Sequence, residues 1–477
     1  MAHGTSTVIR RCHARWHRTA QAGIGPTEQA AILRDCRSLQ QGLTMQFARS
    51  RRRFVRETLL ASAALGAGVH QQAPAQPGNT PSARLNLAAI GVWSRGQENL
   101  LAVRHENIVA LCDVDATFLA RVGELYPQAR RYRDFRELFE REKDLDGVLV
   151  NTPDHTHFHP VMRALQQGIH VYCEKPLAHN VREVREIARA ARDSRSITQM
   201  GNQHHSSAGY QQARDLVQRG DLGEIREVHS WTNRPIWPQG IPRQKSIPVP
   251  PELNWKMWLG PAAERPYTEF YHPLKWRGWW DFGTGALGDM GPHLIDPAFW
   301  ALKLTSPLDI RATSSGVNAE TGPLSSRIQF TFAARGPRPP VQLTWYDGNE
   351  VPDQSVTTVK RPPGNGTMLL GSRARLFIPQ LGGKPIALPR EKGDRIKLPA
   401  PPDESPRHEQ RWLDACKGGP PTNSDFQYAA ALSETCLLGN VALRASQPIR
   451  WNPMTGKTDH PQDDSWLGRE YRPGWEW

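Results

Sequence analysis

Residues 85–96 read Leu-Asn-Leu-Ala-Ala-Ile-Gly-Val-Trp-Ser-Arg-Gly, an apolar run that ends in the glycine at position 91. An apolar run before a glycine turn predicts a buried strand that leads into a helix. A second apolar run over 108–112 ends in Asp113. A strand, a glycine turn that opens a helix and an acid after the next strand form the frame that binds a dinucleotide.

Two residues qualify this frame. Asp113 is expected to bind the ribose 2′-hydroxyl and would repel a 2′-phosphate, so the sequence favours NAD over NADP. Trp93 stands where the pattern has its middle glycine, which lets the backbone approach the pyrophosphate. A plain strand–helix turn is the alternative interpretation of 91–96.

The hydropathy pattern divides the chain after residue 85 into two parts. Continuous apolar runs separated by segments of helical spacing predict a doubly wound, Rossmann-type parallel sheet over 85–205. The later part, 206–477, predicts an α+β domain on a largely antiparallel open sheet, because its apolar residues alternate with polar ones. The expected strands are 85–91, 108–113, 147–150, 170–173, 197–200, 328–332 and 341–345, and the later helices are 407–416 and 425–445. The stretch 234–275, rich in Pro and Trp, is expected to be a long ordered loop.

The N-terminal segment predicts export. Residues 50–56 are basic, 59–69 are weakly apolar, and Ala73-Pro74-Ala75 fits a cleavage site. The pair Arg51-Arg52 resembles the twin-arginine signal, so 45–75 is expected to direct the protein to the periplasm or the extracellular space. Residues 1–44, before Met45, are expected to be a non-native extension. A basic amphipathic helix is the alternative.

Charge and hydropathy exclude two classes of function. The 477 residues include 60 Lys and Arg against 47 Asp and Glu, a net charge of +13, but most of the excess lies before residue 76. The folded body is therefore not basic enough to predict nucleic-acid binding. No apolar run reaches the roughly 20 residues that span a bilayer, so no integral membrane span is expected.

Two later motifs carry candidate chemistry. Glu174-Lys175-Pro176 follows the apolar run that ends in Cys173, which places a lysine at the carboxyl end of a strand. Asp289 and His293 stand four residues apart, so on a helix they share one face. Alternatively, Lys175 is a surface lysine and the Asp/His pair only stabilises a helix.

With these motifs in place, residues 85–477 resemble the Gfo/Idh/MocA family of oxidoreductases, in its exported branch. The resemblance also covers Thr152-Pro153-Asp154-His155, Gly201-Asn202-Gln203, the Trp- and Arg-rich stretch 276–281, and Arg469-Glu470-Tyr471-Arg472-Pro473-Gly474-Trp475.

The resemblance implies roles for named residues. Lys175 would contact cofactor and substrate and stabilise an alkoxide, and His293 would be the general base. Asp289 would orient His293 or hold a substrate hydroxyl, and Glu174 would reach the nicotinamide ribose. Which of Lys175 and His293 takes the proton stays open, and Lys175-Pro176 is a candidate cis peptide. The full cofactor set is Gly91, Ser94, Arg95, Gly96, Asp113, Thr152, Pro153, His155, Glu174 and Lys175, and the substrate set is Gln203, Trp276, Arg277 and Trp280.

Histidines and cysteines raise other interpretations. His155, His157 and His159 alternate, and His204-His205 follow later, which is compatible with a metal cluster. No cysteine or carboxylate cluster completes such a site, so no metal is expected. Cys112 and Cys173 lie in apolar runs and are expected to be buried free thiols.

Together these features predict an exported NAD(P)-dependent oxidoreductase acting on a sugar, cyclitol or glycoside. A redox-assisted glycoside hydrolase or lyase with tightly bound NAD, and a sugar-binding protein without catalysis, are the alternatives. The expected partners are a small carbohydrate or cyclitol and further copies of the chain, joined through the C-terminal sheet.

Overall fold

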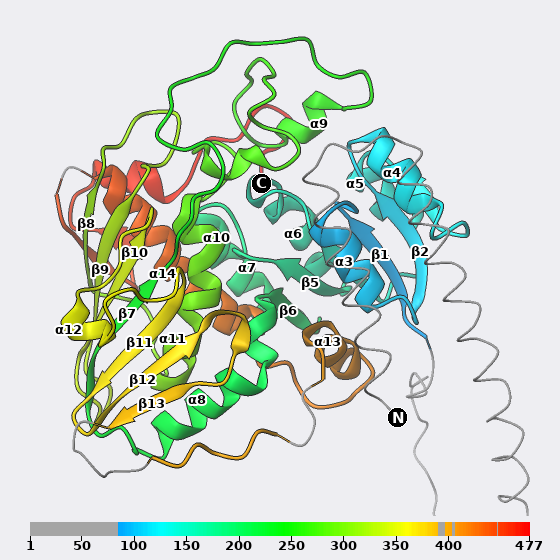
Figure 1. The fold of residues 1–477 in the computed structure, drawn as a ribbon. Helices are drawn as coiled ribbons and strands as arrows, with labels where there is room; N and C mark the ends of the chain where they lie inside the picture. The colour runs from blue at the N-terminus through cyan, green and yellow to red at the C-terminus, as the bar shows by residue number, and fades with distance from the viewer. Residues whose placement is uncertain (1–83, 390–395, 403–405, 446) are drawn as a thin grey trace, which may run out of the picture. The chain divides into compact units, whose positions relative to one another are not determined.

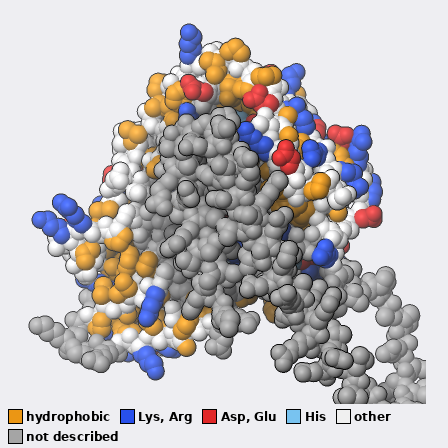
Figure 2. Space-filling view, turned by 45° about the vertical axis from the view of Figure 1, so that its right-hand side comes forward, with side chains coloured by type: hydrophobic (Ala, Val, Ile, Leu, Met, Phe, Trp, Pro, Cys, Tyr) orange, Lys and Arg blue, Asp and Glu red, His pale blue; other side chains and the backbone are white. Residues whose placement is uncertain are grey.

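The computed structural model describes residues 84–389, 396–402, 406–445 and 447–477 (Figure 1). The predicted signal peptide and the extension before it lie outside these residues. No helix within the described ranges is both long and apolar enough to cross a membrane. In Figure 2, Lys and Arg side chains stand beside Asp and Glu side chains on the described part of one face.

The first domain is built on a six-stranded parallel sheet in the order β3-β2-β1-β4-β5-β6, which confirms the predicted Rossmann-type fold. Its strands are β1 (Asn86–Ile90), β2 (Asn107–Cys112), β3 (Arg130–Tyr132), β4 (Gly147–Val150), β5 (His170–Glu174) and β6 (Thr198–Gly201). Its helices are α3 (Arg95–Ala102), α4 (Ala116–Gly123), α5 (Phe135–Arg141), α6 (Phe158–Gln166) and α7 (Val181–Asp193), with the short 3-10 helix η1 (Asp154–Thr156) after β4.

Both faces of this sheet are covered, as its apolar strands require. Leu100 of α3 and Leu119 of α4 pack on one face, and helices α5, α6 and α7 pack on the other. The first face is completed by Trp412 of α13 (His408–Cys416). Helix α13 belongs to the stretch that the sequence assigns to the second domain, yet it packs on the first domain's sheet.

The second domain carries a nine-stranded sheet in the order β13-β12-β11-β7-β10-β9-β8-β14-β15. Only the β7–β10 pair is parallel among its described strands, so the predicted largely antiparallel sheet is confirmed. The strands are β7 (Ile225–Trp231), β8 (Asp309–Ser314), β9 (Ser326–Phe332), β10 (Val341–Asp347), β11 (Gly366–Gly371), β12 (Ala374–Pro379), β13 (Ile386–Pro389), β14 (Ile449–Asn452) and β15 (Lys457–Thr458). The other elements are η2 (Gln203–Ser206), α8 (Ala208–Gln218), α9 (Trp255–Leu259), η3 (Lys275–Gly278), α10 (Gly285–Leu294), α11 (Asp296–Leu302), α12 (Gln354–Thr357), η4 (Gln380–Gly382), α14 (Phe426–Arg444) and η5 (Asp463–Leu467).

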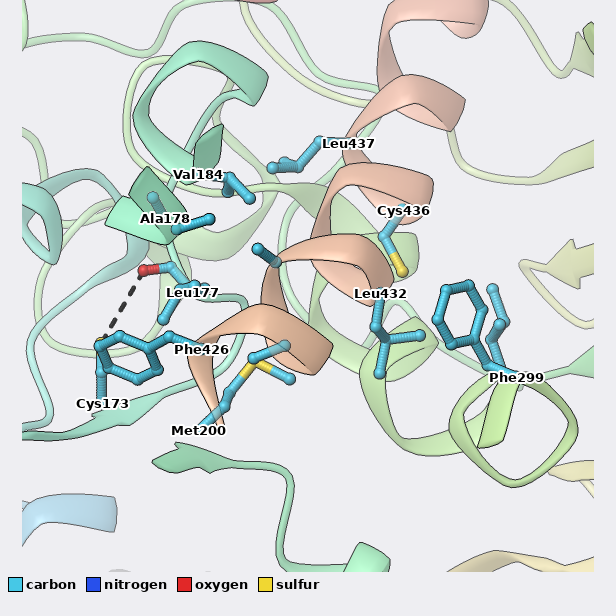
Figure 3. Close-up of a cluster of buried hydrophobic side chains, with 14 of the residues drawn as sticks. Cys173, Leu177, Ala178, Val184, Met200, Phe299, Phe426, Leu432, Cys436 and Leu437 are labelled. Atoms are coloured by element: carbon cyan, nitrogen blue, oxygen red, sulfur yellow. Dashed lines mark hydrogen bonds between the residues drawn. The ribbon is translucent and has the colours of Figure 1, made fainter. Parts of the chain in front are cut away.

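Helix α14 joins the two domains through one continuous core. Figure 3 shows Phe426, Leu432, Cys436 and Leu437 of this helix between side chains of the first domain and Phe299 of α11. The first-domain side chains there are Cys173, Leu177, Ala178, Val184 and Met200. Buried side chains of both domains therefore belong to one continuous hydrophobic core.

The cysteines behave as predicted. Cys112 and Cys173 are buried and free. The Cys173 thiol contacts the carbonyl of Leu177 at 3.8 Å, and burial raises its pKa well above the usual value (Figure 3). These thiols are core side chains and not nucleophiles.

Candidate active site

A cavity of about 410 Å³ lies at the carboxyl ends of the parallel strands. Its walls come from the loops after β1, β2, β4 and β5, from α9 and α10, and from the stretch 272–277. This is where ligands bind in open parallel α/β sheets. The site therefore draws on both halves of the described chain.

The turn after β1 has the backbone that a phosphate cradle needs. Gly91 adopts a φ of 79° and Ser94 a φ of 54°. A Cβ on Gly96 would stand 2.0 Å from the Gly91 carbonyl oxygen, so only glycine lets α3 approach the strand this closely. Trp93 does not fill the turn, because its ring stacks on Phe118 of α4 at 4.8 Å. Gly91, Ser94 and Arg95 all line the cavity.

The rest of the wall also fits a dinucleotide. Asp113 follows β2, lines the cavity and accepts the N–H of Val92 at 2.9 Å, which fixes its carboxylate at the mouth of the turn. The hydroxyl oxygen of Thr152 is buried at the cavity and finds no partner among the described residues. An acid for a ribose and an unpaired hydroxyl at the same cavity are an acceptor and a donor that a bound dinucleotide would satisfy.

Lys175 stands at the centre of the polar wall. Its ammonium group donates to Oδ1 of Asp289 at 2.8 Å and to the Asp289 carbonyl at 2.9 Å. The guanidinium of Arg277 lies 3.3 Å from the same Oδ1. Burial alone would raise the pKa of Asp289, but the charges of Lys175 and Arg277 hold it well below its usual value. Asp289 is thus a carboxylate that fixes Lys175. The structure describes both Asp289 and His293 and shows no hydrogen bond between them, so it does not show Asp289 orienting His293.

His293 lies one turn further along α10 and faces the same cavity. Its Nδ1 is buried and has no partner among the described residues. Its ring centre lies 4.9 Å from that of His204, which also lines the cavity. Burial, and then the neighbouring His204 and Lys175, lower the pKa of His293 well below its usual value. At neutral pH its imidazole is therefore uncharged.

Glu174 and Gln203 form a second polar group at the cavity. Gln203 Nε2 donates to Glu174 Oε1 at 2.7 Å, and Asn99 Nδ2 donates to the same oxygen at 2.8 Å. Two amide donors hold this carboxylate toward the cavity that Lys175 lines. The peptide between Lys175 and Pro176 is cis, as predicted.

Three predicted site residues, Gly96, His155 and Trp280, are not part of the cavity lining. His155 is fully buried, and its Nε2 lies 2.8 Å from the carbonyl of Trp258 while its ring packs on Phe282. Helix η1 turns Asp154 and Thr156 toward the cavity and His155 away from it, so the structure does not place His155 at the cavity where the cofactor is expected. Trp280 also lies outside the lining, because its indole N–H donates to the carbonyl of Asn318. Trp276 and Arg277 do line the cavity, as does Pro153.

The histidines of the alternating stretch contact backbone carbonyls. His157 contacts the carbonyls of Pro176 and Thr152 at 2.9 and 2.8 Å, and His159 contacts that of Trp475 at 2.8 Å. Within the described ranges, no three metal-ligating side chains gather in one place.

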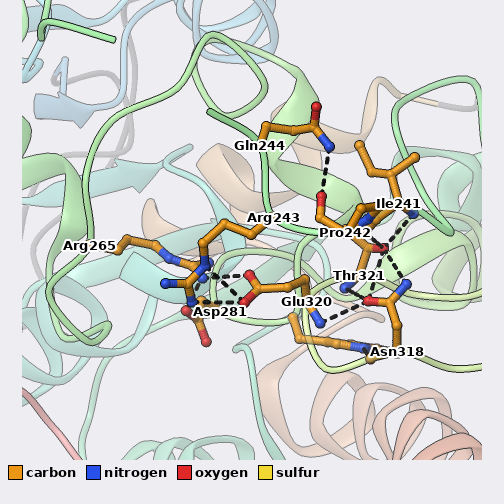
Figure 4. Close-up of polar contacts among 10 residues, drawn as sticks. Ile241, Pro242, Arg243, Gln244, Arg265, Asp281, Asn318, Glu320 and Thr321 are labelled. Carbon is orange, nitrogen blue, oxygen red and sulfur yellow. Dashed lines mark hydrogen bonds and ion pairs between the residues drawn. The ribbon is translucent and has the colours of Figure 1, made fainter. Parts of the chain in front are cut away.

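An ion-pair network around the buried Arg265 fixes the loop above the cavity. Figure 4 shows Arg265 between Asp281, at 3.0 Å, and Glu320, at 2.6 Å, with Arg243 on the same glutamate. The stretch 234–275 contains α9 and is otherwise a loop, as predicted. Because this loop leads to His272 and Trp276 in the cavity wall, the network positions that wall.

Comparison with known proteins decides the family. Residues 63–202 match a model described as oxidoreductase family, NAD-binding Rossmann fold, and residues 211–339 match the C-terminal alpha/beta domain of the same family. The chain belongs to the Gfo/Idh/MocA oxidoreductase family. Its first domain is the family's NAD-binding Rossmann domain. The residues that line the cavity fit a bound NAD.

Several known members are similar to the chain over part of their length. It is 32% identical over 141 residues to 2,7-anhydro-N-acetylneuraminate hydratase of Mediterraneibacter gnavus, which covers 30% of this chain and 33% of that protein. It is 26% identical over 237 residues to D-glucoside 3-dehydrogenase of Escherichia coli, which covers 49% of this chain and 58% of that protein. The matched stretches thus span about a third to over half of these Gfo/Idh/MocA relatives.

Solved structures of the family share the fold. The WlbA dehydrogenase from Bordetella pertussis, in complex with NADH and UDP-GlcNAcA, superposes with a TM-score of 0.57 at 15% identity. The superposition covers 78% of this chain and 98% of that one.

Several lining residues are not indicated by the sequence patterns. The patterns indicate His204 only as a possible metal ligand, and they do not mark Phe118, Met257 or Trp475 as site residues. His204 directly follows Gln203, so its position in the motif was a usable signal. The other three lie in loops and helices, and no local sequence pattern predicts that these segments reach the cavity.

The burial of His155 predicts a pH dependence of stability. Burial, and next the charge of Arg469, lower its pKa to about 3, while an unfolded histidine titrates near 6.5. Its stabilising contribution is therefore complete above about pH 6.5 and is lost as the pH falls toward about 3. Between pH 7.5 and 5, the unfolding free energy of the wild type should fall by about 2 kcal/mol more than that of His155→Asn. Urea unfolding of both proteins at the two pH values measures this.

Phe282→Leu is the matched control for this prediction. Phe282 packs on the same ring, with ring centres 5.1 Å apart, but carries no proton. It should lower stability equally at both pH values. An unchanged pH dependence in His155→Asn would contradict the prediction.

Proposed function

We propose that the chain is an exported NAD-dependent oxidoreductase that oxidises a carbinol of a sugar, cyclitol or glycoside. The observation that carries this proposal is the meeting of Lys175, from the end of β5, with His293 and Asp289, from α10, at one cavity. The named relatives act on sugar-like compounds, as a hydratase and a glucoside dehydrogenase, which supports this class of substrate.

The contacts of Lys175 favour an electrostatic role for this residue. An ammonium group has three N–H donors and no acceptor. Two donors point at Asp289, which leaves one for a substrate oxygen. A charged donor fixed before the reaction stabilises a developing alkoxide without reorganisation.

His293 is the better proton acceptor of the two. Its imidazole is uncharged at neutral pH and lines the cavity beside Lys175 and Asp289. It can take the proton of a substrate hydroxyl that Lys175 holds. Bound NAD would supply the hydride acceptor. Asp289 keeps Lys175 in place through two hydrogen bonds.

Substitutions at these two residues should separate chemistry from binding. Lys175→Ala should abolish turnover, since it removes the alkoxide-stabilising charge, and NADH should still bind. His293→Ala should slow turnover by about 10²–10⁴-fold, the usual contribution of a positioned acid–base group. Steady-state rates, together with NADH titration of each variant, test this.

His229→Ala is the control, because His229 lies on β7 and contacts Tyr346 away from the cavity. Its rate should stay near the wild-type value. Full turnover in Lys175→Ala would remove the proposed mechanism.

The pair His204 and His293 favours redox-assisted glycoside cleavage or elimination as a second candidate. Cleavage through transient oxidation needs a second proton acceptor, for the C–H made acidic by the neighbouring carbonyl. The two rings lie 4.9 Å apart at one cavity, and burial lowers the pKa of His204 to about 4, so both are uncharged near pH 7.

Accumulation of NADH distinguishes these two candidates. Net oxidation should produce NADH in proportion to product when glycosides are supplied with excess NAD. Redox-assisted cleavage should release a reducing sugar with no lasting absorbance at 340 nm, a wavelength that reports reduced nicotinamide.

Export rests on the segment 50–56. Replacing Arg51 and Arg52 together with Lys should leave the protein in the cytoplasm, since the twin-arginine signal is recognised by its paired guanidinium groups. Fractionation with immunoblotting measures this, with Arg49→Lys as the control. Unchanged periplasmic yield in the double variant would contradict the export proposal.

A further inference from the structure

The segment 469–477 lies across the first domain, although the proposed chemistry does not use it. Arg469 Nε lies 3.3 Å from Oε1 of Glu183 in α7, and the Tyr471 hydroxyl donates to the same oxygen at 3.3 Å. Glu183 is almost wholly buried. These contacts fix the start of the segment on the first domain.

A second anchor ties the segment to the loop above the cavity. The Arg472 guanidinium donates to the carbonyls of Lys256 and Gly260, at 2.7 and 2.9 Å. The Arg472 N–H also donates to the carbonyl of Pro261 at 3.1 Å. The segment therefore joins α7 of the first domain to α9 and the loop that follows it.

Trp475 follows these anchors and is itself 7% exposed. Its carbonyl accepts from His159 Nε2 at 2.8 Å, and the Arg136 guanidinium lies over its ring at 5.2 Å. Its ring centre is 5.9 Å from that of Phe135. Trp475 lines the cavity together with Phe135 and Met257, so an aromatic side chain from the far end of the described chain forms part of its apolar wall.

Sheet order shows which part of the cavity this wall belongs to. Phe135 begins α5, directly after β3, and β3 pairs with β2, whose end carries Asp113. Lys175 follows β5, on the other side of β1 and β4. In Rossmann domains the acid after the second strand binds the adenosine ribose. The wall of Trp475 therefore lies on the adenosine side, away from the reacting groups.

We propose that Trp475 is a cofactor-binding residue whose indole forms an apolar wall for the adenosine half of the dinucleotide. The segment 469–472 is the clasp that holds this indole in place. This inference rests on the dinucleotide of the proposed function. It concerns affinity and retention of the cofactor and not the chemical step.

Titration of the full chain with NAD, ADP-ribose and nicotinamide mononucleotide tests this inference. Trp475→Ala should weaken NAD and ADP-ribose by about tenfold each, as expected for loss of an aromatic contact with a base. Nicotinamide mononucleotide should bind as it does to the wild type. Trp475→Phe should recover most of the affinity, because it keeps an aromatic face.

Trp477→Ala is the matched control. Trp477 belongs to the same segment and packs on Phe158 with ring centres 5.4 Å apart, but it is 48% exposed and is not part of the cavity lining. It should bind all three ligands as the wild type does. An equal loss in Trp477→Ala would show general loosening of the segment and would overturn the inference.

Three further outcomes have a defined meaning for this inference. If thermal melting shows that Trp475→Ala is unfolded, Trp475→Leu takes its place, with the same expected loss and the same criterion. Affinities within twofold of the wild type for NAD and ADP-ribose would overturn the role of Trp475 and leave the proposed function standing. A wild-type protein that binds neither ligand would instead contradict the proposed function.

Discussion

The contact between Lys175 and Asp289 is the constraint on which the site depends. Each side chain is less than one-fifth exposed, at 13% and 16%. A buried ion pair is stable only when further donors and acceptors satisfy both charges, because desolvation otherwise exceeds the attraction. Here the Asp289 carbonyl and the Arg277 guanidinium complete the set. Since Lys175 directly follows β5 and Asp289 lies in α10, both domains must be docked for the pair to be satisfied.

The core explains why the docking is fixed. Two residues after Lys175, the N–H of Leu177 donates to Ser433 Oγ in α14 at 3.1 Å. At the neighbouring strand, the N–H of Met200 donates to the carbonyl of Ser424, just before the same helix, at 2.9 Å. Helix α14 thus holds the ends of β5 and β6 from below, while the loop network around Arg265 holds the wall above. The candidate catalytic residues thus lie between two sets of tertiary contacts, which hold them in place as pre-organised catalysis requires.

The sequence predicts whatever local spacing encodes. The apolar runs placed the strands of the first sheet, and the four-residue spacing placed Asp289 and His293 on one helix. It failed where a single turn decides the direction of a side chain. His155 directly follows three residues that line the cavity, yet helix η1 directs it into the aromatic core. It also failed at long range, since Trp475 meets His159 across 316 residues, and no periodicity carries that information.

Trp93 shows that a glycine pattern records separate physical demands. The left-handed backbone falls on Gly91 and Ser94, with φ of 79° and 54°, and the closest approach falls on Gly96. Position 93 needs neither a positive φ nor a close backbone approach, so a large side chain is tolerated there where its ring can pack. The ring finds Phe118 of α4, nearly parallel at 9°. Both rings line the cavity beside Asp113, so the exchanged glycine changes the wall around the ribose and leaves the turn itself intact.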